Sequence, residues 1–360
     1  MNLSQLNHRW EKYKRKHGLV SQALLEEVRF DAPAGVEASF DLLEMLEGRY
    51  ILHLSRPFPI LRGDYTSFIL DHEFTHFADF LTYPYPKPTL GDLKERDLRE
   101  ANINTASDKN IFGTYGEINL PEKPDIANPF EGDIGKKLFD YMNTYSEFHA
   151  CQVALSGILP DMTRQQPFDV EKNIVPAPYR DVSVKNMLAN CLRRAHAGYK
   201  EFRVMMLPQV FVVYFRQMMY LMGYLSHFGN DRAMLESTFD ILEIGEQKEN
   251  YYTLYEALKA KDYGRILEYT NRIYSESYLV FVKTFIKAHY NPNLYTEDEL
   301  NQITPDNYDE FVETLANREG GRIWSGRVSP VFGVNNVNRA YDGVDPETVR
   351  RIVGKKYSMT

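Results

Sequence analysis

The stretch FILDHEFTHFADF, residues 68–80, decides how this chain is interpreted. It places His72, Glu73 and His76 in the pattern H-E-x-x-H, within an apolar run that is typical of a buried helix. Two histidines four residues apart on a helix project from one face, so both rings can reach the same point. The stretch therefore allows two interpretations, a metal site or a core helix that contains two histidines by coincidence.

Zinc is the metal that such a pair of imidazoles favours. Glu73, beside the first histidine, is placed to take a proton from zinc-bound water and pass it to a leaving amine. In a chain with nine histidines, composition alone would produce H-E-x-x-H by chance in about one or two of a hundred cases. We therefore expect Zn2+ as cofactor, His72 and His76 as metal ligands, and Glu73 as the catalytic residue.

The neighbouring sequence indicates a strand, a loop and then the motif helix. RYILHLSRPF, residues 49–58, is rich in β-favouring residues and is followed by a proline-containing loop. The motif helix must end at YPYPKP, residues 83–88, where alternating prolines prevent its continuation. A strand before a helix is the context that a zincin requires around H-E-x-x-H.

A site with two histidines needs a third protein ligand, which leaves the fourth position for water. The metzincin arrangement requires a glycine three residues after the second histidine and a third ligand three residues further on. This chain has Asp79 and Thr82 at those positions, so that arrangement is excluded. The remaining option is a glutamate from a separate helix, and two candidates are open, Glu95 and Glu147.

The surroundings of the two glutamates differ. Glu95 follows His76 with eighteen residues between them, but its neighbours are charged, as on a solvated helix. Glu147 lies in residues 132–157, which we predict to form a second strong helix. Its face carries small side chains that would let this helix approach the motif helix closely: Asn143, Thr144, Ala150, Cys151 and Ala154. We favour Glu147 as the third metal ligand, and Glu95 stays open.

The sequence suggests roles for three further polar residues, but defines them less closely. Asp79, seven residues after His72, is placed to accept a ring N–H from a ligand histidine, or to be a helix-surface carboxylate. Tyr145 and His149 are candidates for stabilising an oxyanion, although His149 points away from the Glu147 face.

With these residues the chain resembles the gluzincin metallopeptidases, through HEFTH at residues 72–76 and a later helix with EFHA at residues 147–150. The E-x-x-A form is similar to the compact ImmA/IrrE-type members. The resemblance covers about residues 49–155, and the chain departs from it at Cys151, where an aspartate is frequent, and in a long insertion between the motifs. It implies a zinc-dependent metallopeptidase that hydrolyses peptide bonds in a peptide or protein substrate. The alternative is a zincin-fold binding or regulatory protein with little or no turnover.

We predict an α+β, predominantly helical fold. A zincin-like domain with a small sheet would occupy residues 1–165, beginning with a helix over residues 1–30, and a mainly helical region would occupy residues 166–360. The boundary is expected in a proline-containing linker at residues 159–181. Helical periodicity then continues almost throughout residues 182–289, which would form a wall of the cleft or bind the substrate.

Composition and charge exclude several classes of function. The net charge of -8 argues against nucleic-acid binding, which depends on lysine and arginine. The two cysteines, Cys151 and Cys191, offer at most one disulfide, and the N-terminal stretch has no apolar segment of a secretory signal. We therefore expect reduced thiols and a cytoplasmic location, and the oligomeric state is not indicated.

One apolar segment, residues 204–225, is about long enough to span a bilayer. It contains Pro208, Gln209, Arg216 and Gln217, and a central arginine with two amides is costly in lipid. We expect a buried central helix and no membrane partner.

Overall fold

The computed structural model describes, with short gaps, residues 2–92, 132–158 and 208–304, together with short stretches within residues 174–196 and 307–315. Over these residues the protein is mostly helical and contains a small mixed sheet, which confirms the predicted α+β class. The elements are the helices α1 (Leu3–His17), α2 (Leu42–Leu46), α3 (Asp64–Leu81), α4 (Gly132–Tyr141), α5 (Glu147–Ile158), α7 (Pro208–Leu225), α8 (Asp231–Leu242), α9 (Lys248–Ala260), α10 (Tyr263–His289) and α11 (Glu297–Asn301), and the strands β1 (Glu27–Arg29), β2 (Ala38–Phe40), β3 (Ile51–Leu54), β4 (Ile174–Pro176) and β5 (Asp181–Ser183).

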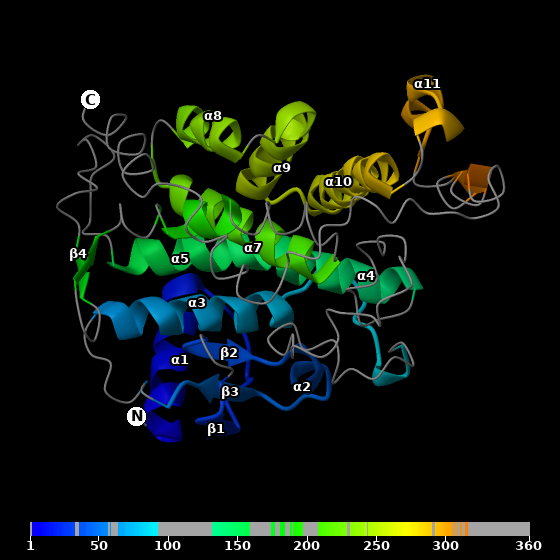
Figure 1. Ribbon diagram of the computed structural model, residues 1–360. Helices are drawn as coiled ribbons and strands as arrows, with labels where there is room; N and C mark the ends of the chain where they lie inside the picture. Colours follow the sequence, from blue (N-terminus) through cyan, green and yellow to red (C-terminus); the bar gives the residue numbers. More distant parts are fainter. Residues whose placement is uncertain are drawn as a thin grey trace.

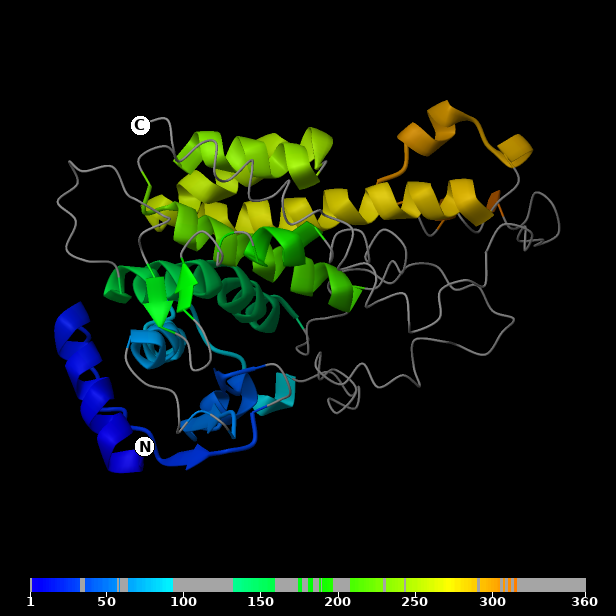
Figure 2. The same cartoon turned by 60° about the vertical axis from the view of Figure 1, so that its left-hand side comes forward.

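The helices form layers on one side of the sheet. In Figure 1, α3 lies next to the three strands, α5 and α4 lie above α3, α7 follows, and α8, α9 and α10 lie farthest from the sheet. Figure 2 shows the same order after rotation, with α1 flanking the sheet and α3. The motif helix α3 is therefore enclosed between the sheet and α5.

The three-stranded sheet has the order β1-β3-β2, with β1 parallel and β2 antiparallel to the central strand. The central strand β3 is the one predicted at residues 49–58, and α3 follows it after a loop, so the predicted order of strand, loop and helix is confirmed. α3 ends at Leu81, just before the proline run at residues 83–88, as predicted.

The helix predicted over residues 1–30 is wrong beyond His17. Gly18 adopts φ 66°, a left-handed conformation that ends a helix at little cost for glycine, and its N–H caps the carbonyl of Lys14. The chain then extends, and Val28 pairs with Leu52 as part of β1. A three-residue strand is too short to show the alternation by which strands are predicted.

The two faces of α3 have different partners. On one face, the fully buried Phe77 lies with its ring centroid 4.8 Å from that of Trp10 and 5.1 Å from that of Phe40. Burying such a side chain contributes about 1.5–3 kcal/mol, so this face anchors the helix to α1 and the sheet. His72 and His76 lie on the face toward α5.

The second predicted helix, residues 132–157, is confirmed as α4 and α5, joined by a π-helical turn, η5 (Met142–Ser146). A π turn widens the helix by one residue and is often found at functional sites. The sequence did not predict this turn, and it ends immediately before Glu147.

α7 packs closely on α5, and Gly223 is the residue that permits this approach. A Cβ atom at Gly223 would lie 2.4 Å from the carbonyl oxygen of Phe148 and 2.8 Å from the Cβ of Cys151. Buried residues of α7, including Phe215, Met218 and Met222, confirm the predicted buried helix over the part of residues 204–225 that the structure describes.

Buried side chains from Leu6 in α1 to Tyr274 in α10 form one hydrophobic cluster. The predicted linker at residues 159–181 lies mostly outside the described residues, and the boundary at residue 165 stays a prediction. The described helices α7 to α11 fall within the helical region predicted for residues 166–360, which also contains the short strands β4 and β5. Among the described helices, none combines the length and the apolar character that a membrane crossing needs.

Candidate metal centre

Two imidazoles of α3 meet at the centre of the site. The Nε2 atoms of His72 and His76 lie 3.1 Å apart, and the rings are nearly perpendicular, at 85°. The four-residue spacing along α3 places both side chains on one face, as the motif predicted. The same ring nitrogen of each histidine is therefore directed at one point.

The carboxylate of Glu147 reaches this point from α5. Its Oε2 atom lies 3.2 Å from His76 Nε2 and 3.8 Å from His72 Nε2, although 71 residues separate Glu147 from His76 in the sequence. Over the described residues, these three side chains are the only group of three His, Cys, Asp or Glu residues that converges so closely. Glu95, the other predicted candidate, lies outside the described residues.

The donor set fits a metal ion in its chemistry. Glu147 Oε2 is shielded from solvent and, within the described part of the chain, accepts no well-formed hydrogen bond. A buried oxygen in this condition is costly unless a cation or a proton donor satisfies it. Two imidazole nitrogens and one carboxylate oxygen form the ligand set of catalytic zinc sites that leave a position for water.

Small groups on α5 and the π turn hold the outer nitrogens of the two rings. His76 Nδ1 lies 2.8 Å from the hydroxyl Oγ of Ser146. The Nδ1 atom of His72 lies 3.8 Å from Cys151 Sγ. Such outer partners orient a ring and leave its other nitrogen free to bind a metal. Of the small residues predicted to allow close approach, Cys151 contacts the His72 ring, whereas Ser146 was not among them.

Burial and mutual proximity set the charges of the three groups. Burial, with His76 nearby, lowers the pKa of His72 to about 3. Burial alone would lower the pKa of His76, but the Glu147 carboxylate outweighs it and raises the value to about 8. Burial likewise opposes ionisation of Glu147, yet His76 and Arg216 lower its pKa to about 2. At neutral pH Glu147 is therefore ionised and His72 neutral, the states that metal ligands need, whereas His76 is mostly protonated and would have to release its proton to bind a metal.

Glu73 lies beside the ligands, with 7% of its surface exposed. Burial raises its pKa to about 8, well above the ordinary value for a carboxyl group. A carboxyl group that titrates near neutral pH can both accept and release a proton under physiological conditions.

Two side chains of α7, Arg216 and Tyr220, complete the site and were not assigned to it from the sequence. Arg216 Nε lies 3.1 Å from the second carboxylate oxygen, Oε1, of Glu147. The Tyr220 ring lies edge-on to His72, with centroids 5.6 Å apart. The sequence did contain a signal for Arg216, because a lone arginine within an apolar run needs a buried partner. The sequence contained no such signal for Tyr220, which is one of many aromatic residues in this region.

The predicted partner of Asp79 is wrong. Asp79 accepts from His149, whose Nδ1 lies 2.9 Å from Asp79 Oδ1, while the outer nitrogen of His76 faces Ser146. Tyr145 stacks on His149, with ring centroids 5.3 Å apart, and is hydrogen-bonded to Tyr263. The two residues suggested for oxyanion stabilisation therefore have other partners.

The chain was also compared with known proteins at three levels. No family model, no curated protein and no solved structure matches it.

Proposed function

We propose that this protein is a zinc-dependent metallopeptidase with a zincin-like catalytic unit that hydrolyses peptide bonds. The observation that carries the proposal is the convergence of His72 Nε2, His76 Nε2 and Glu147 Oε2 from two helices. In this proposal the three residues hold the metal. A bound zinc ion supplies Lewis acidity, which polarises a substrate carbonyl and lowers the pKa of a water molecule.

The residues of the chain carry the proton transfers. Glu73 accepts a proton from the attacking water and delivers it to the leaving amine, which its raised pKa and its position beside His72 support. The hydroxyl of Tyr220 is the donor that we assign to the carbonyl oxygen of the substrate, because the Tyr220 ring lies edge-on to His72. In this proposal Ser146 keeps the ring of His76 in place during the reaction.

A second function, a zincin-fold binding or regulatory protein with little or no turnover, is favoured by one observation. Glu147 is already balanced by two cationic partners, Arg216 and the His76 ring, whose pKa is raised. The carboxylate would therefore be stable without a metal ion. The two functions differ in whether substitution of Glu73 lowers the rate of peptide cleavage.

The test compares wild type with Glu73→Gln in a digest of a peptide library, read by mass spectrometry in the presence of zinc. A glutamine side chain has nearly the same shape as glutamate but cannot accept the proton, so we expect cleavage to fall by about 10²–10⁴-fold. Zinc content should be equal in the two proteins, since Glu73 is not a ligand in this account. Equal cleavage by both proteins would exclude the proposed mechanism.

A further inference from the structure

Two residues of α7, Arg216 and Tyr220, keep contact with solvent on an otherwise buried helix. Within the described part of α7, residues 214–225, every other side chain is buried. Arg216 and Tyr220 are four residues apart and so share one face of the helix, which is the face directed at Glu147 and His72. The side chain of Arg216 is 32% exposed. An ion pair at this depth is less screened than one on the surface.

Arg216 makes two defined contacts with the helical segment that contains Glu147. Its Nε lies 3.1 Å from Glu147 Oε1, and its Nη2 donates to Asn143 Oδ1 over 2.7 Å. Asn143 in turn donates from Nδ2 to the carbonyl oxygen of Phe139 over 2.9 Å. The amide of Asn143 is thereby oriented with its oxygen toward the guanidinium.

These contacts divide the two oxygens of Glu147 between two directions. Oε1 faces Arg216, and Oε2 faces the ring nitrogens of His72 and His76. The guanidinium contacts Glu147 through Nε alone, as an ion pair without hydrogen-bond geometry, while its Nη2 is held by Asn143. This ion pair favours the orientation of Glu147 that presents Oε2 to the point where the two rings converge.

We infer that Arg216 is a positioning residue for metal binding, which it promotes through Glu147. This inference rests on the proposed function, because it assumes that Glu147 is a metal ligand. Two effects of Arg216 oppose each other, since its positive charge repels a cation while its contacts hold the carboxylate in place. The carboxylate lies between the two charges and shields them, and loss of an outer partner typically weakens metal affinity by about 10–100-fold. Positioning therefore outweighs repulsion.

The test measures zinc affinity of the metal-free, full-length protein by competition with a chromophoric chelator, together with the visible absorption spectrum of its cobalt(II) form. The variants are Arg216→Met, which has similar length without donors, and Arg216→Lys, which keeps the charge without the guanidinium. Arg232→Met is the matched control, because Arg232 stacks on Tyr252 in α8 and α9. Circular dichroism of each metal-free protein checks that it is folded.

For Arg216→Met we expect zinc affinity to fall by about 10–100-fold and the cobalt spectrum to change in position and intensity. Arg216→Lys should recover only part of the affinity, and Arg232→Met should match wild type. If Arg216→Met does not fold, Arg216→Lys and Asn143→Ala carry the test, since each loosens the same contacts.

Two results would overturn the inference while leaving the proposed function intact. One is a wild-type protein that binds zinc while Arg216→Met binds it equally tightly with an unchanged cobalt spectrum. The other is tighter binding by Arg216→Met, which would mean that repulsion dominates. A wild-type protein that binds neither metal would instead overturn the proposed function, and this inference with it.

Discussion

Tyr220 is a tyrosine of α7 whose ring lies next to His72, one of the candidate metal ligands. Its ring is 5.6 Å from that of His72, and burial, with Glu147 nearby, raises the pKa of Tyr220 well above its ordinary value. The hydroxyl is therefore protonated at neutral pH and available as a donor. A donor that is already in place when negative charge develops on a carbonyl oxygen stabilises the transition state without reorganisation.

Tyr220→Phe removes this donor and keeps the ring. We expect kcat on a peptide identified in the library digest to fall by about 10²–10³-fold, with little change in zinc affinity. Steady-state kinetics and the chelator competition measure the two quantities. Tyr269→Phe on α10, where the ring lies beside Arg265 and Arg272, is the control. Unchanged kcat in Tyr220→Phe would remove Tyr220 from the mechanism.

Among single residues, those linked by short sequence spacing were predictable and the others were not. His72, Glu73 and His76 follow from one motif, and Glu147 follows from the small side chains beside it. Arg216 and Ser146 could not be assigned, because their relation to the ligands is created only when α5 and α7 pack on α3. Asp79 is buried and pairs with His149, which is neither of the two roles considered for it, because helical spacing indicates a face of the helix but not the neighbour that lies across it.

At the scale of elements, the contact between α5 and α7 determines whether Arg216 reaches Glu147. Gly223→Ala places a methyl group against the carbonyl oxygen of Phe148, a backbone atom that cannot rotate away. We expect a loss of about 1–3 kcal/mol in the free energy of unfolding and weaker zinc binding, because α7 must move outward. Urea denaturation and the chelator competition measure both effects.

Gly264→Ala is the matched control for this substitution. Gly264 lies in α10, and the nearest atom to a Cβ there is Asp262 Oδ1 at 3.6 Å, an ordinary contact. Alanine in a helix is favoured over glycine by up to about 1 kcal/mol, so this variant should be as stable as wild type or slightly more so. Equal stability of Gly223→Ala and Gly264→Ala would contradict the close packing of α7 on α5.

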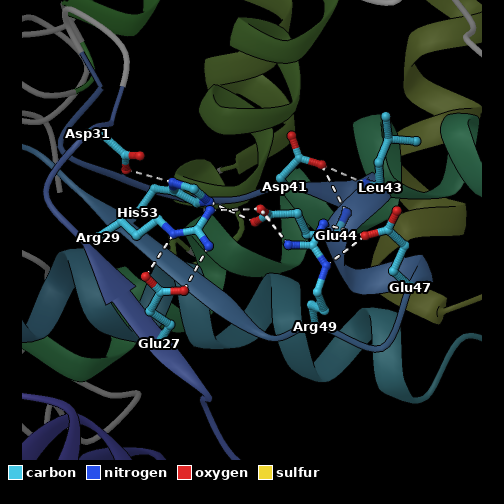
Figure 3. Close-up of polar contacts among 9 residues, drawn as sticks. All are labelled: Glu27, Arg29, Asp31, Asp41, Leu43, Glu44, Glu47, Arg49 and His53. Carbon is cyan, nitrogen blue, oxygen red and sulfur yellow. Dashed lines mark hydrogen bonds and ion pairs between the residues drawn. The ribbon is translucent and has the colours of Figure 1, made fainter.

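A charged cluster joins β1, β3 and α2, and His53 is its central residue (Figure 3). His53 Nδ1 lies 2.7 Å from Asp31 Oδ1, and its Nε2 lies 2.8 Å from Glu44 Oε2. Burial lowers the pKa of His53, but the two carboxylates outweigh burial, and the net shift is upward. Arg29 and Arg49 also contact Glu44, so its charge is shared among three partners.

The raised pKa predicts how this cluster contributes to stability as pH changes. The folded protein holds the His53 proton more tightly than the unfolded chain, whose histidine has a pKa of about 6.5. The stabilisation is therefore complete below about pH 6.5 and is lost as pH rises through the higher folded-state pKa. Urea denaturation across this range should show that His53→Gln costs most at low pH and progressively less at high pH. The exposed His8→Gln is the control, and a cost that does not vary with pH would contradict the prediction.

Long helices were predicted correctly from the sequence, whereas the shortest strands were missed. The long periodic helices around residues 64–81 and 132–158 were expected, and the structure has them. β1 and β2 were missed because three residues carry no periodicity, and the first helix was extended past Gly18 because nothing local required the chain to turn there except the glycine. The π turn before Glu147 has no recognised sequence signal of its own.

At the scale of the whole molecule, the class of fold and the burial of the central helix were predictable from composition and periodicity. The layered order of sheet, α3, α5 and α7 was not, because it depends on which apolar faces meet. That order places the candidate metal centre between the N-terminal elements and α7, so residues from both parts of the chain surround it. The sequence indicated that the later helices border the site, but not that Arg216 of α7 would pair with Glu147 of α5.

The most direct test of the central claim is the zinc content of purified full-length protein, measured by elemental analysis after exposure to zinc and removal of the excess. We predict about one zinc ion per chain in wild type and in the control His8→Ala, and almost none in His72→Ala, His76→Ala or Glu147→Ala. Circular dichroism would confirm that these variants are folded. Stoichiometric zinc that survives substitution of Glu147, or a wild-type protein that retains no zinc, would contradict the account.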